Sequence, residues 1–514
     1  MNYRTSLACV ASLALVAACG QRSEEAAEPA AEPAPAETSP AAPGSMVLPA
    51  TTSSPEALAL YLDGWKTWDV GRFVDAHKQF VAAGEADPSF AMAHLMAAIS
   101  AQSTESFVSK LRTASETAAE ASAGEQLMIR SIERAFAGDQ VGQIAALEEL
   151  TAVHPDSPRA WSFLGFSQGQ INNTAASREA LYKASELDPT MVGPHFTLAN
   201  NYMFLEPKDL AKAEKHAMKA VELASDEPNP YDLLGDVHRS QGNLEAAYDD
   251  YTKAAELAPA MGSPLQQRGH VNSFLGNYDE ARADYTKSAE LEDARGTNTG
   301  PFFLVFRAYV DIHAGNPDAA IAELRSLADA AADSDMEGAA DFRVNALSSA
   351  ALIAIHYGNA DAASAAIEDM AAVMRAQADE VGTDEYRDAQ EATIAYNEGL
   401  LAARMGDAET AAAKAAAFEG FAASSQNPRK LERMHEILGM SAYYQGDHEG
   451  AVEHLSKGDP QGTMYTKYYL ALAHESLGNS EEAARMFNEL AVWNFNGPGY
   501  ALIRGDVLAK VSQS

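Results

Sequence analysis

The chain has 514 residues, more than one hydrophobic core usually supports, so several domains or an array of repeats is expected. Alanine is abundant, aromatic residues make up only 8%, and strand-type runs are scarce, which predicts an all-helical protein. The formal net charge of −36, without a Lys/Arg cluster, argues against nucleic acid and against a basic membrane-binding face. Such an acidic surface either keeps a long molecule soluble or favours basic partners.

The first 18 residues have the pattern of an export signal. Arg4 provides a positive charge, residues 7–16 are apolar, and small residues precede Cys19. The apolar stretch is too short to span a bilayer as a helix, so it predicts a cleaved signal peptide over residues 1–18.

The sequence Val16-Ala17-Ala18-Cys19 resembles the lipobox of bacterial lipoproteins. That resemblance implies cleavage before Cys19, lipidation of Cys19, and, with Gly20 next, an anchor in the outer membrane facing the periplasm. The alternative is an ordinary secretory peptide in which Cys19 is incidental. The other cysteine, Cys9, lies in the signal, so the mature chain is expected to form no internal disulfide and no thiolate metal site.

Residues 19–50 are rich in Pro, Ala and Glu and contain almost nothing to bury. This composition predicts that the segment is a disordered tether between the lipidated cysteine and the folded part of the chain.

Residues 51–500 contain an internal repeat with a period near 34. The segments 229–259 and 263–293 align without gaps, with Gly235 on Gly269 and Tyr251 on Tyr285. A small residue in a first helix lets the second helix approach closely, and a Gly followed by Asn or Asp ends one helix and begins the next. This turn recurs at Gly138-Asp139, Gly242-Asn243, Gly276-Asn277, Gly315-Asn316, Gly358-Asn359, Gly406-Asp407, Gly446-Asp447 and Gly478-Asn479.

The pattern resembles the tetratricopeptide repeat (TPR) family, and the N-terminal features add a resemblance to bacterial TPR lipoproteins. The resemblance implies an all-α fold, an α-solenoid coiled as a right-handed superhelix of about twelve helix-turn-helix units. The units are expected to start near residues 57, 91, 124, 158, 192, 228, 262, 301, 344, 392, 432 and 464.

Several irregularities are expected in this array. The unit at 192 has an insertion at 205–209, the unit at 91 has a degenerate second helix, and residues 334–342 and 378–391 lengthen connections. Residues 494–500 should be a loop, and 501–514 should form a helix that caps the exposed end, because each unit buries its apolar face only against its neighbours.

Residues 165–169 form a literal G-x-S-x-G, the pattern that presents the serine nucleophile of some hydrolases. Ser167, however, falls in the middle of a predicted first helix, whereas a nucleophile elbow needs a strand immediately before it. Motifs for metal, nucleotide or dinucleotide binding are not found, so no catalytic residue, metal or cofactor is expected.

In TPR proteins, the concave surface is lined mainly by first helices and usually binds peptides or partner helices. Carried over to this chain, that implies a groove lined by Phe166, Phe196, Asn200, Asp236, His270, Tyr309, Leu352 and Met440. Any of these side chains could instead pack between adjacent first helices. The Lys/Asn pattern that clamps a terminal carboxylate in some family members is not evident, because Asp232 and Asp236 stand there.

The sequence thus leads to a hypothesis of a non-catalytic, lipid-anchored scaffold or adaptor that binds protein or peptide partners. It would contact the membrane only through its N-terminal lipid. Two alternatives stay open: a hydrolase that uses Ser167, and a periplasmic binder of glycans or small molecules that assists export.

Overall fold

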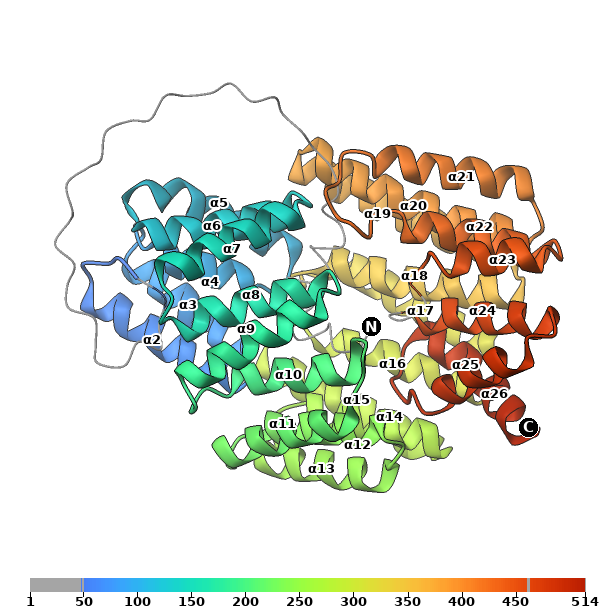
Figure 1. Ribbon diagram of the computed structural model, residues 1–514, viewed down its shortest axis with the longest axis horizontal. Helices are drawn as coiled ribbons and strands as arrows, with labels where there is room; N and C mark the ends of the chain where they lie inside the picture. The colour runs from blue at the N-terminus through green and yellow to red at the C-terminus, as the bar shows by residue number, and fades with distance from the viewer. Residues whose placement is uncertain (1–47, 49, 460–462, 514) are drawn as a thin grey trace.

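The computed structural model describes residues 48, 50–459 and 463–513 (Figure 1). Over these residues the regular structure is helical, with 25 α-helices, one short 3₁₀ helix and no strand. Twelve antiparallel helix pairs follow one another and a single helix ends the chain, which confirms the expected all-α solenoid. We number these pairs as units 1 to 12.

The first six units occupy the N-terminal half of the array. Their helices are α2 (Pro55–Asp69) and α3 (Phe73–Ala86), α4 (Ala91–Ile99) and α5 (Thr104–Thr117), α6 (Ala123–Phe136) and α7 (Gln140–Val153), α8 (Pro158–Gln170) and α9 (Thr174–Leu187), α10 (Gly193–Phe204) and α11 (Leu210–Leu223), α12 (Pro228–Ser240) and α13 (Leu244–Leu257). The 3₁₀ helix η1 (Ala118–Glu120) follows α5.

The second six units include the longest helices. They are α14 (Ser263–Leu275) and α15 (Tyr278–Arg295), α16 (Gly300–His313) and α17 (Pro317–Ala332), α18 (Ala339–Tyr357) and α19 (Ala360–Val381), α20 (Asp384–Arg404) and α21 (Ala408–Phe421), α22 (Glu432–Tyr444) and α23 (His448–Leu455), α24 (Met464–Ser476) and α25 (Ser480–Ala491). The last helix is α26 (Pro498–Gln513).

The turns inside the units follow the sequence pattern. All eight glycines of the Gly-Asn/Asp turns have φ between 72° and 82°, the left-handed region in which glycine is least strained. The following side chain caps the next helix at Asp139, Asn243, Asn359, Asp407 and Asp447. Units 1 and 4 make the same turn with Gly71 and Asn172, which the pattern did not include.

Some expected irregularities were wrong. In unit 2 the shortened element is α4, with 9 residues, while α5 is a full helix of 14 residues. Most of residues 378–391 belongs to α19 and α20 instead of a long connection. The connection expected at 334–342 is present, but it spans residues 333–338, since α18 begins at Ala339. The last helix begins at Pro498, so the last three residues of the expected loop are helical.

The array curves so that its ends lie on opposite sides of the central units, with the blue helices and the red helices flanking the yellow ones (Figure 1). The turn after α2 reaches unit 6, where Asn229 Nδ2 donates to Val70 O at 2.8 Å. At the other end, α26 packs against α24 and α25 and also against α16 and α18. The final helix therefore covers the last unit and part of the inner surface of units 8 and 9.

Candidate functional site

All eight predicted groove residues lie on first helices, six of them on five successive units from α8 to α16. The other two are Leu352 on α18, which is partly exposed, and Met440 on α22, which is 3% exposed. Phe166, Phe196 and Asn200 are partly exposed. Asp236, His270 and Tyr309 are not, with exposed fractions of 0%, 0% and 2%. The predicted groove is therefore open in units 4 and 5 and filled in units 6 to 8.

Two of the three buried side chains in units 6 to 8 form hydrogen bonds or ion pairs with other residues of the array. Asp236 Oδ1 pairs with Arg239 of its own helix and accepts a hydrogen bond from Tyr251 Oη at 2.7 Å. The hydroxyl of Tyr309 lies 2.8 Å from Ser349 Oγ on α18, so Tyr309 packs between adjacent first helices. Asp236 Oδ1 and the Tyr309 hydroxyl therefore bond within the array, the first inside its own unit and the second between adjacent first helices.

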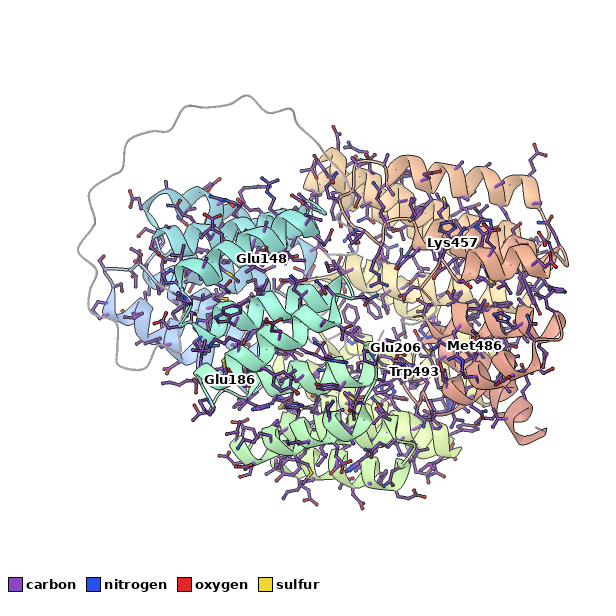
Figure 2. The ribbon with its side chains drawn as sticks, in the orientation of Figure 1. Glu148, Glu186, Glu206, Lys457, Met486 and Trp493 are labelled. Carbon is purple, nitrogen blue, oxygen red and sulfur yellow. The ribbon has the colours of Figure 1, made fainter. Side chains whose placement is uncertain are left out.

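The chain itself fills the central groove with residues 493–497, a stretch without regular secondary structure that we call the C-terminal segment. The rings of Trp493 and Phe495 lie 5.5 and 4.9 Å from the ring of Phe204 on α10. The Arg239 guanidinium on α12 stacks 4.4 Å above the ring of Phe495. Figure 2 shows Trp493 beside the labelled Glu206, in the loop that joins α10 to α11.

The two asparagines of the C-terminal segment continue this contact along the groove. Asn494 Nδ2 donates to Arg239 O at 3.3 Å. Asn496 Nδ2 lies 3.4 Å from His270 Nδ1, and Asn496 Oδ1 lies 3.3 Å from His313 Nε2. Phe204, Arg239, His270 and His313 belong to units 5, 6, 7 and 8, so four consecutive first helices each provide one side chain.

Burial controls the charges of this surface. It lowers the pKa of His270 well below the usual value and lowers the pKa of His313 to about 4, so both imidazoles are neutral at pH 7. Burial and the negative charge of Asp236 raise the pKa of Asp232 well above its ordinary range. Burial also raises the pKa of Asp236, although Arg239 opposes the shift.

The open part of the groove contains two aromatic side chains and one amide. Phe166 and Asn200 each follow the small residue of their helix, and Phe196 lies one turn before Asn200. Asn200 Nδ2 donates to Phe196 O at 2.9 Å, while its Oδ1 is buried without a hydrogen-bond donor in the described chain. This arrangement leaves the partly exposed rings of Phe166 and Phe196 on the surface of the groove, with the unpaired Asn200 Oδ1 buried beneath it.

Ser167 has no nucleophile geometry. It lies in the interior of α8, is 3% exposed, and its Oγ accepts a hydrogen bond from Gln143 Nε2 at 3.1 Å. No group of three or more His, Cys, Asp or Glu suited to a metal ion occurs within residues 48, 50–459 and 463–513. The same residues include no helix that is long and apolar enough to cross a membrane, and Cys19 and residues 20–47 of the predicted tether lie outside them. The predicted end of the tether at residue 50 was wrong, because Leu48 is 2% exposed and packs in the core of the first units.

The sequence did not predict that residues 493–497 occupy the groove. Residues 494–497 were expected only as part of a connecting loop, yet Asn494, Phe495 and Asn496 are 4%, 4% and 0% exposed. The composition Trp-Asn-Phe-Asn was an available signal, because two large aromatic rings in five residues are too apolar for a loop that only crosses the surface.

Comparison with known proteins gives the family of the central units. A family model described as the tetratricopeptide repeat matches residues 229–261 and 263–295. Among solved structures, MamA shares 23% identity over 32% of this chain and 95% of its own, with a TM-score of 0.28. MamA 41-end from Desulfovibrio magneticus RS-1 shares 19% identity over 33% and 96%, also at 0.28.

A third solved structure is YrrB, described as a TPR protein with an unusual peptide-binding site. It shares 17% identity over 37% of this chain and 94% of its own, with a TM-score of 0.25. The search of curated proteins found no match. The matched segments 229–261 and 263–295 coincide with units 6 and 7, and these two units are tetratricopeptide repeats.

Proposed function

We propose that this protein is a non-catalytic scaffold that binds a protein or peptide partner along the inner surface of its repeats. The observation that carries the proposal is the C-terminal segment, an irregular stretch of polypeptide contacted by one side chain from each of units 5 to 8. A surface that recognises its own chain in this way has the spacing needed to recognise an extended peptide.

The partner surface in this proposal is the open groove of units 4 and 5. Phe166 and Phe196 provide aromatic contact area, and the partly exposed Asn200 lies one turn after Phe196 on the same helix. Trp493 borders this stretch, since it contacts Phe204 at the end of α10. A bound peptide would therefore continue the line of the C-terminal segment toward the N-terminal units.

Site-specific photo-crosslinking in cells tests this surface. A photoreactive phenylalanine analogue replaces Phe166 or Phe196, and the matched control replaces Met218, which is 57% exposed on the second helix of unit 5. The expected result is one protein captured from both groove positions and not from position 218. Identical products from all three positions would contradict the groove as the partner site.

The proposal also places the scaffold on a lipid anchor. Cys19 would carry the acyl chains, and residues 20–47 would let the array reach partners near the outer membrane from the periplasmic side. Cys19→Ala and treatment with the signal-peptidase inhibitor globomycin should each release or misprocess the protein. If processing and membrane fractionation stayed unchanged, the lipid anchor would be wrong, and the groove would be unaffected.

A further inference from the structure

Unpaired polar atoms gather on the inner surface of units 5 and 6. The side-chain atoms that are buried without a hydrogen-bond partner in the described chain include Asn200 Oδ1 on α10, three atoms on α12, and Asn494 Oδ1 in the C-terminal segment. The three on α12 are Asp232 Oδ1, Asp236 Oδ2 and Arg239 Nε. Each such atom lowers the stability of the fold when it is left unpaired, so we expect a ligand or water to form the missing hydrogen bonds.

Four of these five atoms are acceptors. The two amides cannot be turned the other way, because Asn200 Nδ2 donates to Phe196 O and Asn494 Nδ2 donates to Arg239 O. The two carboxyl oxygens accept as well when they are ionised. Among these five atoms the acceptors therefore outnumber the donors, and the one donor is Arg239 Nε.

The same place also lacks positive charge. Arg239 is the only cation recorded in contact with the Asp232–Asp236 pair among the described residues, and it forms its ion pair with Asp236. Over the same residues Asp232 forms no ion pair of its own: its hydrogen-bond contact is the neutral amide of Gln267, with Nε2 3.4 Å from Asp232 Oδ2, and Arg239 attracts it without a direct contact. The Asp232 carboxyl group is thus left without a direct ion pair, and burial and Asp236 raise its pKa although the charge of Arg239 opposes the shift.

The C-terminal segment does not supply the missing cation, since residues 493–497 are Trp, Asn, Phe, Asn and Gly. Asp232 also lies next to the open groove. Asp232 in unit 6 and Phe196 in unit 5 both stand three residues before the small residue of their first helix, so they are neighbours in one row of the inner surface.

We propose that Asp232 is a specificity-determining residue that receives the ammonium or guanidinium group of a Lys or Arg side chain. The occupant is an extended peptide whose adjacent apolar side chains contact Phe196 and Phe166. The inference rests on the proposed function and adds the charge of the partner to it. The net charge of −36 favours the same partner, because it draws basic segments toward the molecule.

The test uses three fluorescein-labelled pools of nine-residue peptides. The central residue is Lys, Gln or Glu, and the flanking positions mix Phe, Leu, Asn and Ser. Binding to the full chain is followed by fluorescence anisotropy at 150 mM salt. The Lys pool should bind about tenfold more tightly than the Gln pool, the effect of one charge-assisted hydrogen bond.

Variants of unit 6 separate a specific site from general attraction to an acidic protein. Asp232→Asn should reduce the Lys/Gln ratio to about one and leave binding of the Gln pool unchanged. Asp232→Glu should retain the preference. Asp249→Asn is the matched control, since it removes one exposed charge from the second helix of the same unit. Circular dichroism and thermal melting check that each variant is folded.

Each outcome decides the proposal. Equal binding of the three pools would leave a peptide-binding groove but overturn the basic partner, and the unpaired atoms would then hold water. A Lys preference that survives Asp232→Asn would overturn Asp232 as its cause. Failure of all pools to bind would count against both the peptide-binding groove and this inference.

Discussion

At the scale of single residues, Gly235 illustrates how tightly the helices of a unit are packed. A Cβ atom placed on Gly235 would lie 2.6 Å from Tyr251 Cε1, and Tyr251 is fully buried on the second helix of the unit. Gly235→Ala should therefore lower the free energy of unfolding by about 1–3 kcal/mol, because a buried ring must move. Chemical denaturation measures this change.

Gly420→Ala provides the control for that substitution. Gly420 is an exposed helical glycine with nothing within 4 Å of an added Cβ atom. Alanine in this position should stabilise the helix by about 0.5–1 kcal/mol. Equal effects of the two substitutions would mean that close approach to Tyr251 is not the reason for Gly235.

His313 makes a pH dependence testable at one residue. Burial lowers its pKa to about 4, below the ordinary value of 6.5, so the unfolded chain binds more protons between these values. This contribution to stability is complete above pH 6.5 and is lost as the pH falls toward 4. His313→Gln should flatten the fall in unfolding free energy over that range.

Urea unfolding at several pH values measures the His313 effect. His216 and His356 also have pKa values lowered to about 4 by burial, so part of the acid sensitivity should remain in the variant. Above pH 7 the two proteins should differ by a constant amount, because His313 is then neutral in both states. Parallel curves over the whole range would show that His313 does not contribute.

The sequence predicted which small residues let the two helices of a unit pack closely and where the turns lie. It did not predict which groove side chains are exposed to a partner. Gly235 and the Gly-Asn turns are defined by contacts within one unit, and such local contacts leave a repeating pattern. The environments of His270 and His313 depend on Asn496, 226 and 183 positions away in the chain. A repeat register gives the direction of a side chain and carries no information on what covers it.

At the scale of elements, the C-terminal segment should contribute more stability than its length suggests. Phe495 is 4% exposed and contacts both Phe204 and Arg239. Phe495→Ala should cost about 3–5 kcal/mol, and hydrogen exchange should increase in α10 and α12, far from it in sequence. Val492→Ala is the control: Val492 is 50% exposed, so this substitution should change the free energy of unfolding by less than about 0.5 kcal/mol.

A different result would change the role of the segment. If Phe495→Ala loosened only α25 and α26, the segment would be a surface connection without a part in holding the central units together. The helix boundaries that the sequence missed have the same kind of explanation. α4 is short and all nine of its residues are buried, so its length is set by what surrounds it and not by its own pattern.

At the scale of the whole molecule, the curvature of the array brings unit 2 against unit 9. Thr104 N and Oγ1 each donate to the carboxylate of Asp341 at 2.9 Å, and Ser103 Oγ donates to Glu337 at 2.9 Å. A cleft of about 610 Å³ lies beside these bonds and is lined by the same residues. The closure at this point is therefore polar and close to solvent, and such contacts add little net stability.

We expect this contact to set how far the two halves of the array separate. Asp341→Ala removes the acceptor of two bonds across the contact and of a third from Gln377 Nε2 at 2.8 Å. Spin labels on cysteines at Glu116 of α5 and Ala376 of α19, in a chain with Cys9 and Cys19 replaced, should then report a longer and broader distance distribution. Glu105→Ala is the control, because Glu105 lines the same cleft but takes no part in these bonds. An unchanged distribution in Asp341→Ala would mean that packing along the superhelix, including α26 against α16 and α18, holds the halves together without this contact.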